Sequence, residues 1–136
     1  MDWVKKFVFY NLTSNHKVFF MDMCQLDNYG LEQNWGLVLV DHGVAGTRYI
    51  NINKFAQLAN FIIAHDAEKS SDHMYKYEKM KVRDNFKYAC KFSIYGSKNS
   101  YTSTLILSNF FDVSKLTKIF DQIKTDNGHV SCDLNF

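Results

Sequence analysis

The stretch FKYACKFSIYGSKNSYTSTLIL, residues 86–107, decides the fold class that the sequence predicts. Its first half places apolar residues at every second position from Phe86 to Ile94, which is typical of a strand with one buried face. Residues 96–100 are polar and contain glycine, as expected of a hairpin turn. Residues 101–107 again have strand character. We therefore predict an antiparallel hairpin over 86–107.

Segments of similar character lie on both sides of this hairpin. Aromatic and β-branched residues predict strands over 4–10, 16–24, 35–40 and 48–52, the first two forming a hairpin. The alternation of residues 75–83 predicts one more strand directly before the hairpin. The sequence is therefore expected to build antiparallel sheets.

Two segments change to helical spacing. Asn53 is a good N-cap, and apolar residues at 55, 58, 59, 62 and 63 predict an amphipathic helix over 54–67. Asp112 or Ser114 begins a second helix that ends at Asn127 and Gly128. The predicted fold class is α+β, with antiparallel sheets packed against two helices in the order ββββα-βββα. Residues 1–128 form a single domain, with two repeated halves (1–68 and 69–128) as the open alternative, and 129–136 are a C-terminal tail.

Charge is unevenly distributed along the chain, although the net charge is only +2. Residues 69–98 carry eight basic and three acidic side chains, whereas the segments before and after them are slightly acidic. On the predicted strands 75–83 and 86–95, one row of side chains is cationic and aromatic. That row consists of Tyr75, Tyr77, Lys79, Lys81, Arg83, Lys87, Lys91 and Tyr95.

A flat sheet face with cations and exposed rings has the chemistry that single-stranded nucleic acid requires. Cations neutralise phosphates, and aromatic rings stack on bases for about 1–3 kcal/mol each. We therefore expect a protein that binds single-stranded DNA or RNA on this face. The alternative interpretation of the same residues is a solvated sheet face whose lysines keep the protein soluble.

No catalytic signature is found in the sequence. It contains no P-loop, no GxGxxG, no GxSxG and no HExxH motif, and the five histidines are scattered. Three cysteines without a CxxC spacing predict neither a disulfide framework nor a zinc site, and Cys90 is expected to be a buried, inert thiol. We expect no catalytic residues, no metal and no cofactor, and therefore no enzyme.

The last residues, 132–136, end in Asp-Leu-Asn-Phe. This segment resembles the C-terminal peptide of bacterial and phage single-stranded DNA-binding proteins, which docks partner proteins through its final aromatic residue. The resemblance implies that Leu134 and Phe136 bind a partner, such as a replication protein or a host protein. A frayed end is the alternative interpretation.

The succession of strands leading into a helix, twice over, resembles the Whirly fold and the related positive-cofactor-four coactivators. The junctions at 49–55 and 107–113 carry this resemblance. It implies binding of single-stranded DNA or RNA on a sheet surface, as a homo-oligomer. The composition, poor in proline and rich in Asn, Lys, Tyr and Phe, suits a phage or viral protein.

No signal peptide and no apolar run of membrane-spanning length are found in the sequence, so we expect a cytoplasmic protein that binds no membrane. The second candidate function, from the excess of aromatic residues, is a protein-interaction module such as a viral inhibitor of a host factor or an assembly component. A small enzyme whose site assembles in space is the third.

Overall fold

The computed structural model describes residues 31, 34–43, 46–95, 101–120, 122 and 129–136, which belong to one unit of the chain. The strands predicted over 4–10 and 16–24 lie outside these residues. So does Cys24, and so do residues 123–128, where the second helix was expected to end.

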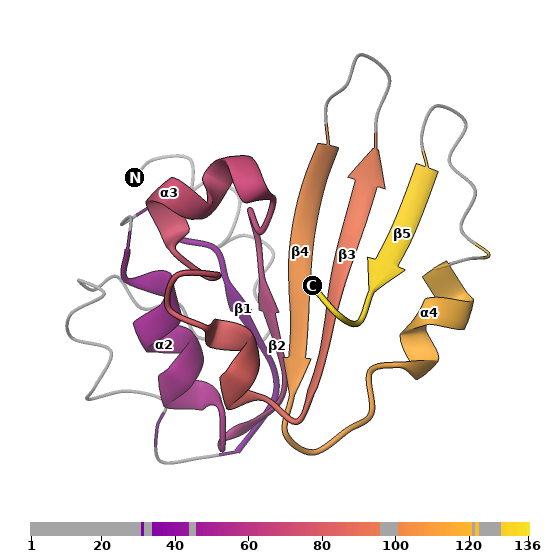
Figure 1. Cartoon of the computed structure of the whole chain (residues 1–136). Coiled ribbons are helices and arrows are strands. Elements are labelled where there is room, and N and C mark those ends of the chain that lie inside the picture. Colours follow the sequence, from indigo (N-terminus) through magenta and orange to yellow (C-terminus); the bar gives the residue numbers. More distant parts are fainter. Residues whose placement is uncertain (1–30, 32–33, 44–45, 96–100, 121, 123–128) are drawn as a thin grey trace, which may run out of the picture. The chain divides into compact units, whose positions relative to one another are not determined.

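A five-stranded sheet organises this unit, with the strand order β1-β2-β4-β3-β5 (Figure 1). The strands are β1 (Trp35–Val40), β2 (Ala59–Ala64), β3 (Tyr88–Tyr95), β4 (Tyr101–Ser108) and β5 (His129–Asp133). β1 and β2 are parallel, and all other pairs are antiparallel. The predicted α+β class, a largely antiparallel sheet packed against helices, is confirmed, although the order of elements differs.

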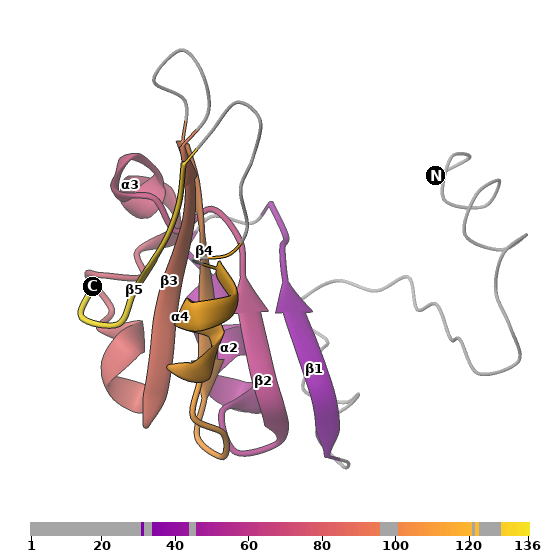
Figure 2. The same ribbon diagram turned by 90° about the vertical axis from the view of Figure 1, so that its right-hand side faces the viewer.

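The helix α2 (Arg48–Phe55) connects the two parallel strands, so β1, α2 and β2 form a βαβ unit (Figure 2). Its buried residues recur at helical spacing, at positions 48, 51, 52 and 55, and Ile52 is fully buried. The chain then turns through residues 56–58 and enters β2. The strand predicted over 48–52 is therefore wrong, and the helix predicted over 54–67 is wrong beyond its first residues.

The predicted hairpin is present as β3 and β4, which pair from Tyr88 opposite Ser108 to Tyr95 opposite Tyr101. β4 also pairs with β2, which gives it a neighbour on each side. The segment expected to be a tail instead contains β5, which pairs with β3. A disulfide joins Cys90 of β3 to Cys132 of β5. The expectation of a free, inert Cys90 is therefore wrong, because pairing of β5 with β3 brings the two cysteines together.

No strand forms over 75–83, where the sequence predicted one. This part of the chain contains the short helices η3 (Lys69–Ser71), α3 (Asp72–Tyr75) and η4 (Val82–Asn85). Lys76 and Lys81 have left-handed backbone conformations, with φ of 60° and 49°, which turn the chain and interrupt any extended segment. The cationic and aromatic row predicted for this segment therefore does not lie on a sheet.

The two faces of the sheet are covered differently. On one face, the sheet is covered by α2 and the segment from η3 to η4. Ile62 and Leu107 of the sheet and Val82 of η4 are buried between these layers. On the other face, α4 (Lys115–Phe120) packs against the β3–β5 part, where the rings of Phe92 and Phe120 lie 4.2 Å apart. The two junctions at 49–55 and 107–113 differ in structure, since residues 49–55 lie within α2 whereas residues 109–113 follow β4.

Candidate functional site

A buried arginine lies where the two parallel strands end. Arg48, at the start of α2, is 2% exposed. Its Nε donates to the carbonyl oxygen of His42 at 2.7 Å, and one terminal nitrogen donates to the carbonyl oxygen of His65 at 2.8 Å. The other terminal nitrogen pairs with Asp41 at 3.1 Å. Because Asp41 follows β1 and His65 follows β2, Arg48 holds the carboxyl ends of both strands together.

The segment after β2 completes the surroundings of Arg48. The guanidinium lies 3.7 Å from the ring centroid of Tyr75 and hydrogen bonds the hydroxyl of Tyr77 at 3.4 Å. Burial is the largest single influence on the pKa of Arg48 and lowers it, but Tyr77, Tyr75 and Asp66 together outweigh burial, so the pKa is raised. Burial raises the pKa of the Tyr77 hydroxyl, and both groups keep their protons at neutral pH.

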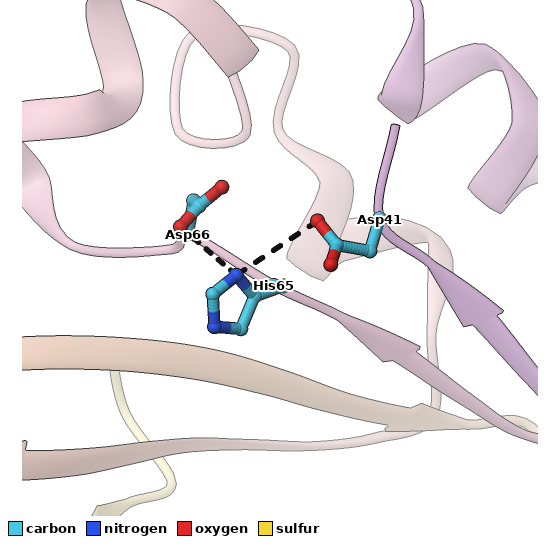
Figure 3. Close-up of side chains that lie close together, drawn as sticks. All are labelled: Asp41, His65 and Asp66. Atoms are coloured by element: carbon cyan, nitrogen blue, oxygen red, sulfur yellow. Dashed lines mark ion pairs between the residues drawn. The ribbon is translucent and has the colours of Figure 1, made fainter. Parts of the chain in front are cut away.

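Three side chains beside Arg48 have the chemistry of metal ligands. Asp41, His65 and Asp66 each offer one ligand atom, and these atoms lie within 4.8 Å of one another. Figure 3 shows the His65 ring between the two carboxylates, with Nδ1 at 2.9 Å from Asp66 and 3.8 Å from Asp41. Arg48 already contacts both carboxylates, at 3.1 and 3.2 Å. Since a guanidinium supplies the positive charge, we assign this cluster to fastening the strand ends.

His42 lies next to this cluster, and its Nε2 lies 3.0 Å from the side-chain nitrogen of the buried Asn51. Burial, and then the nearby charge of Arg48, lower the pKa of His42, so the ring is neutral at pH 7. Its Nδ1 is buried and has no hydrogen-bond partner within the described part of the chain. Nε2 of His42 therefore faces an amide and not a carboxylate.

A second polar site is a pocket of about 400 Å³ above β3 and β4. Lys91 and Leu105, which are opposite each other in the β3–β4 ladder, form part of its lining. The segment before β3 and the last residue of the chain complete it with side chains that the sequence had singled out. We call it the Lys91 pocket; these lining residues are Tyr77, Lys81, Arg83 and Phe136.

The charges of the Lys91 pocket balance. Three cations, Lys81, Arg83 and Lys91, face three acids, Asp72, Glu78 and Asp84. Lys91 Nζ lies 6.0 Å from the centroid of the Phe136 ring, and Arg83 donates to the carbonyl oxygen of Phe86 at 3.0 Å. The pocket therefore presents cations beside an aromatic ring, with carboxylates that limit its attraction for anions.

The predicted site residues are only partly brought together. Tyr77 is 5% exposed, and Tyr75 stacks on Tyr77 with ring centroids 6.0 Å apart, so neither ring offers the open face expected for base stacking. Lys79 is exposed in the turn before η4 and is not part of the lining. Lys87 is exposed just before β3, with Nζ 5.1 Å from the Tyr88 ring centroid.

The exposed ring pair lies elsewhere on the same face as Lys91. Tyr95 and Tyr101 are opposite each other at the end of the β3–β4 hairpin, 44% and 36% exposed, with ring centroids 5.7 Å apart. Tyr101 was not among the predicted site residues, although the hairpin register that pairs it with Tyr95 could have identified it. Leu134 and Phe136 follow β5 and are half-buried.

An apolar surface lies on the sheet face opposite Lys91. We define the apolar face as Leu37, Leu39, Phe61, Ile63 and Phe111. The register of β1 and β2 places Leu37 beside Phe61 and Leu39 beside Ile63, and the rings of Phe61 and Phe111 lie 5.3 Å apart. Leu37 and Leu39 are 55% and 64% exposed. Contiguous exposed apolar residues of this kind mark interaction surfaces.

No family model, no curated protein and no solved structure matches the chain. None of the helices in the described part is long and apolar enough to cross a membrane.

Proposed function

We propose that this chain binds single-stranded nucleic acid at the Lys91 pocket. The observation that supports this is the convergence of Lys81, Arg83 and Lys91 beside the ring of Phe136. These cations come from a turn, from η4 and from β3, so the fold gathers them around one space. A strand of nucleic acid needs this combination, because cations bind its phosphates and rings stack on its bases.

The ring pair at the hairpin end extends the proposed site. Lys91 and Tyr95 project from the same face of β3, four residues apart, which is about 13 Å along a strand. A short stretch of nucleic acid reaches from the pocket to the exposed rings of Tyr95 and Tyr101. The volume of about 400 Å³ lies in the range of small-molecule sites and suits one nucleotide better than a longer segment.

Salt dependence tests this function quantitatively. Three phosphate contacts on a single strand give a slope of log K against log salt of about −2, and affinity then falls roughly twentyfold between 50 and 200 mM salt. Fluorescence anisotropy of a labelled oligo-dT measures both quantities. Absence of binding at low salt, or binding with no salt dependence, would refute the proposal.

Charge-neutralising variants test its location. Lys91→Gln and Lys81→Gln each reduce the magnitude of the salt slope by about 0.7, whereas Lys115→Gln on α4 leaves it unchanged. Glu78→Gln removes an acid from the lining and strengthens binding. Phe136→Ala weakens binding by about 1–3 kcal/mol if this ring stacks on a base. Equal effects of Lys91→Gln and Lys115→Gln would contradict the assignment to the pocket.

The apolar face favours a second candidate function, a protein-interaction module. Leu37 and Leu39 expose more than half of their surface beside Phe61 and Ile63, and a nucleic acid offers no match for an uncharged apolar surface. Affinity purification from host lysate after nuclease treatment tests this function. A partner retained by the wild type and lost with Leu39→Lys supports it, and loss of every partner on nuclease treatment contradicts it.

A further inference from the structure

The apolar face borders the edge of the sheet that β1 forms. Within the described residues, β1 is the end strand of the sheet and pairs with β2 alone. Its sequence, WGLVLV, contains no charged residue and no proline. Edge strands are usually protected from pairing with other chains by charge, by proline or by a bulge. β1 lacks the first two of these protections.

The backbone of β1 also has groups directed away from β2. The amide of Trp35 donates to the carbonyl oxygen of Leu58 at 2.7 Å, on the β2 side. Because alternate residues in a strand direct their amides to opposite sides, the amides of Gly36 and Val38 point toward the outer edge. A Cβ atom placed on Gly36 would point to a face of the sheet, and it meets no atom within 4 Å.

These features suit a second copy of the same strand. An isologous interface brings each residue against residues of the same surface, so a charged edge would repel its own copy. β1 carries no charge over its six residues. In an antiparallel pair centred on Val38, Leu37 of one copy lies opposite Leu39 of the other, and the outward amides of Gly36 and Val38 take part in the ladder.

We infer that the partner of the apolar face is a second copy of this chain, paired antiparallel through β1 about a two-fold axis at Val38. The inference develops the second candidate function and is independent of the Lys91 pocket. The five-stranded sheets of the two copies become continuous across the axis, and the exposed Leu37 and Leu39 side chains lie against their counterparts.

The mass of the full chain in solution tests this inference. Light scattering after size exclusion, over about two orders of magnitude in concentration, is expected to give twice the chain mass of 15.9 kDa. The double variant Leu37→Lys/Leu39→Lys is expected to be monomeric. Ile119→Lys is the matched control, because Ile119 is 54% exposed on α4. It changes the same chemistry at the same exposure and is expected to stay dimeric.

Gly36→Lys keeps the test decisive if the double variant does not fold. The Cβ atom that this substitution adds meets no atom within 4 Å apart from its chain neighbours, and the lysine places a like charge on the edge strand of each copy. Circular dichroism confirms that it folds, and a monomeric mass is expected. A monomeric wild type, a dimer unchanged by Gly36→Lys, or a dimer equally lost with Ile119→Lys would overturn the inference.

Crosslinking tests the register. Across an antiparallel hydrogen-bonded pair the Cα atoms lie about 5.5 Å apart, within the range that a disulfide can span. In a Cys24→Ser background, Val38→Cys is expected to form a covalent dimer on oxidation, whereas Met80→Cys in the turn before η4 is not. A covalent dimer from both variants, or from neither, would overturn the two-fold register. Oligo-dT anisotropy on these variants separates failure of the dimer from failure of the nucleic-acid proposal.

Discussion

Replacing Arg48 by methionine tests the structural role of the buried guanidinium. Methionine has a similar reach and no charge, so the volume is nearly kept while every polar contact is lost. The carbonyl oxygen of His42 loses its donor, whereas that of His65 keeps the Tyr77 hydroxyl at 3.0 Å. Asp41 and Asp66 both lose the guanidinium and keep the contact with the His65 ring.

The expected destabilisation follows from these losses. An unsatisfied carbonyl costs about 1–3 kcal/mol. The aspartate side chains are 50% and 28% exposed, so each ion pair is discounted for solvent screening to about 0.5 kcal/mol. The contact with the Tyr75 ring adds about 0.5–1 kcal/mol. Relief of burying a charge offsets part of the sum, which leaves about 3 kcal/mol.

Urea unfolding followed by tryptophan fluorescence measures this difference in the free energy of unfolding. Arg83→Met is the matched control, because Arg83 donates a hydrogen bond to the carbonyl oxygen of Phe86 and its replacement is expected to cost less than about 1 kcal/mol. Arg48→Lys keeps the charge but not the planar fork, and is expected to fall between the two. Equal free energies for Arg48→Met and Arg83→Met would refute the reasoning.

Three further predictions concern other buried groups. Because the pKa of His42 is lowered by folding, the unfolded chain binds more protons than the folded chain as the pH drops from 7.5, and the free energy of unfolding falls until the pH reaches the folded pKa. Thermal melting at a series of pH values measures this slope. The variant His42→Gln is expected to remove the slope, whereas the exposed control His73→Gln is expected to keep it. The Cys90–Cys132 disulfide spans 42 residues, so Cys90→Ser is expected to lower the free energy of unfolding by about 4 kcal/mol in the chain-entropy model. If iodoacetamide alkylates both cysteines before any reductant is added, the disulfide is contradicted. Ser108 Oγ donates to the carbonyl oxygen of Asn60 and accepts from two amides, so Ser108→Ala costs about 2 kcal/mol in urea unfolding, whereas the exposed Ser70→Ala costs nothing measurable.

The sequence predicted correctly those strands whose pattern of apolar and polar residues fits a strand alone. β1, β3 and β4 lie where strand character was read, and the β3–β4 hairpin closes where glycine and polar residues interrupt the alternation. Placement of Lys91 and Tyr95 on one face of β3 followed from the same period of two. Local pattern sufficed for β3 and β4 because these two strands are close in sequence and pair with each other.

The errors arise where tertiary contacts decide between two patterns. β2 is flanked by β1 and β4 and buries Ala59, Ile62 and Ala64, so its apolar run matches helical spacing as well as a strand. The helical state of residues 48–55 depends on burial of Arg48 and Ile52, which no local rule reveals. Over 75–83, the alternation of tyrosines and lysines resembled that of a strand, but Lys76 and Lys81 have left-handed backbone conformations that turn the chain.

The Arg48 cluster could not be predicted from the sequence either. Its members are far apart in the chain, and they meet because two strands run parallel and end side by side. Asp41 and Asp66 each follow an apolar run, which was the available signal. That signal becomes informative once β2 is known to be a strand, since the carboxyl ends of parallel strands lie at one edge of the sheet.

The order of strands in the sheet also bears on synthesis of the chain. β2 emerges from the ribosome long before β4, because residue 101 follows residue 64 by 37 positions. At about 5–20 residues per second, β2 waits roughly 2–7 seconds for its second neighbour. During that interval the edge of β2 that later pairs with β4 has no partner, and neither β1 nor β2 carries a charge. Uncharged strands with an unpaired edge favour aggregation of the newly made chain. Yield of soluble protein is therefore expected to depend on translation speed between these strands.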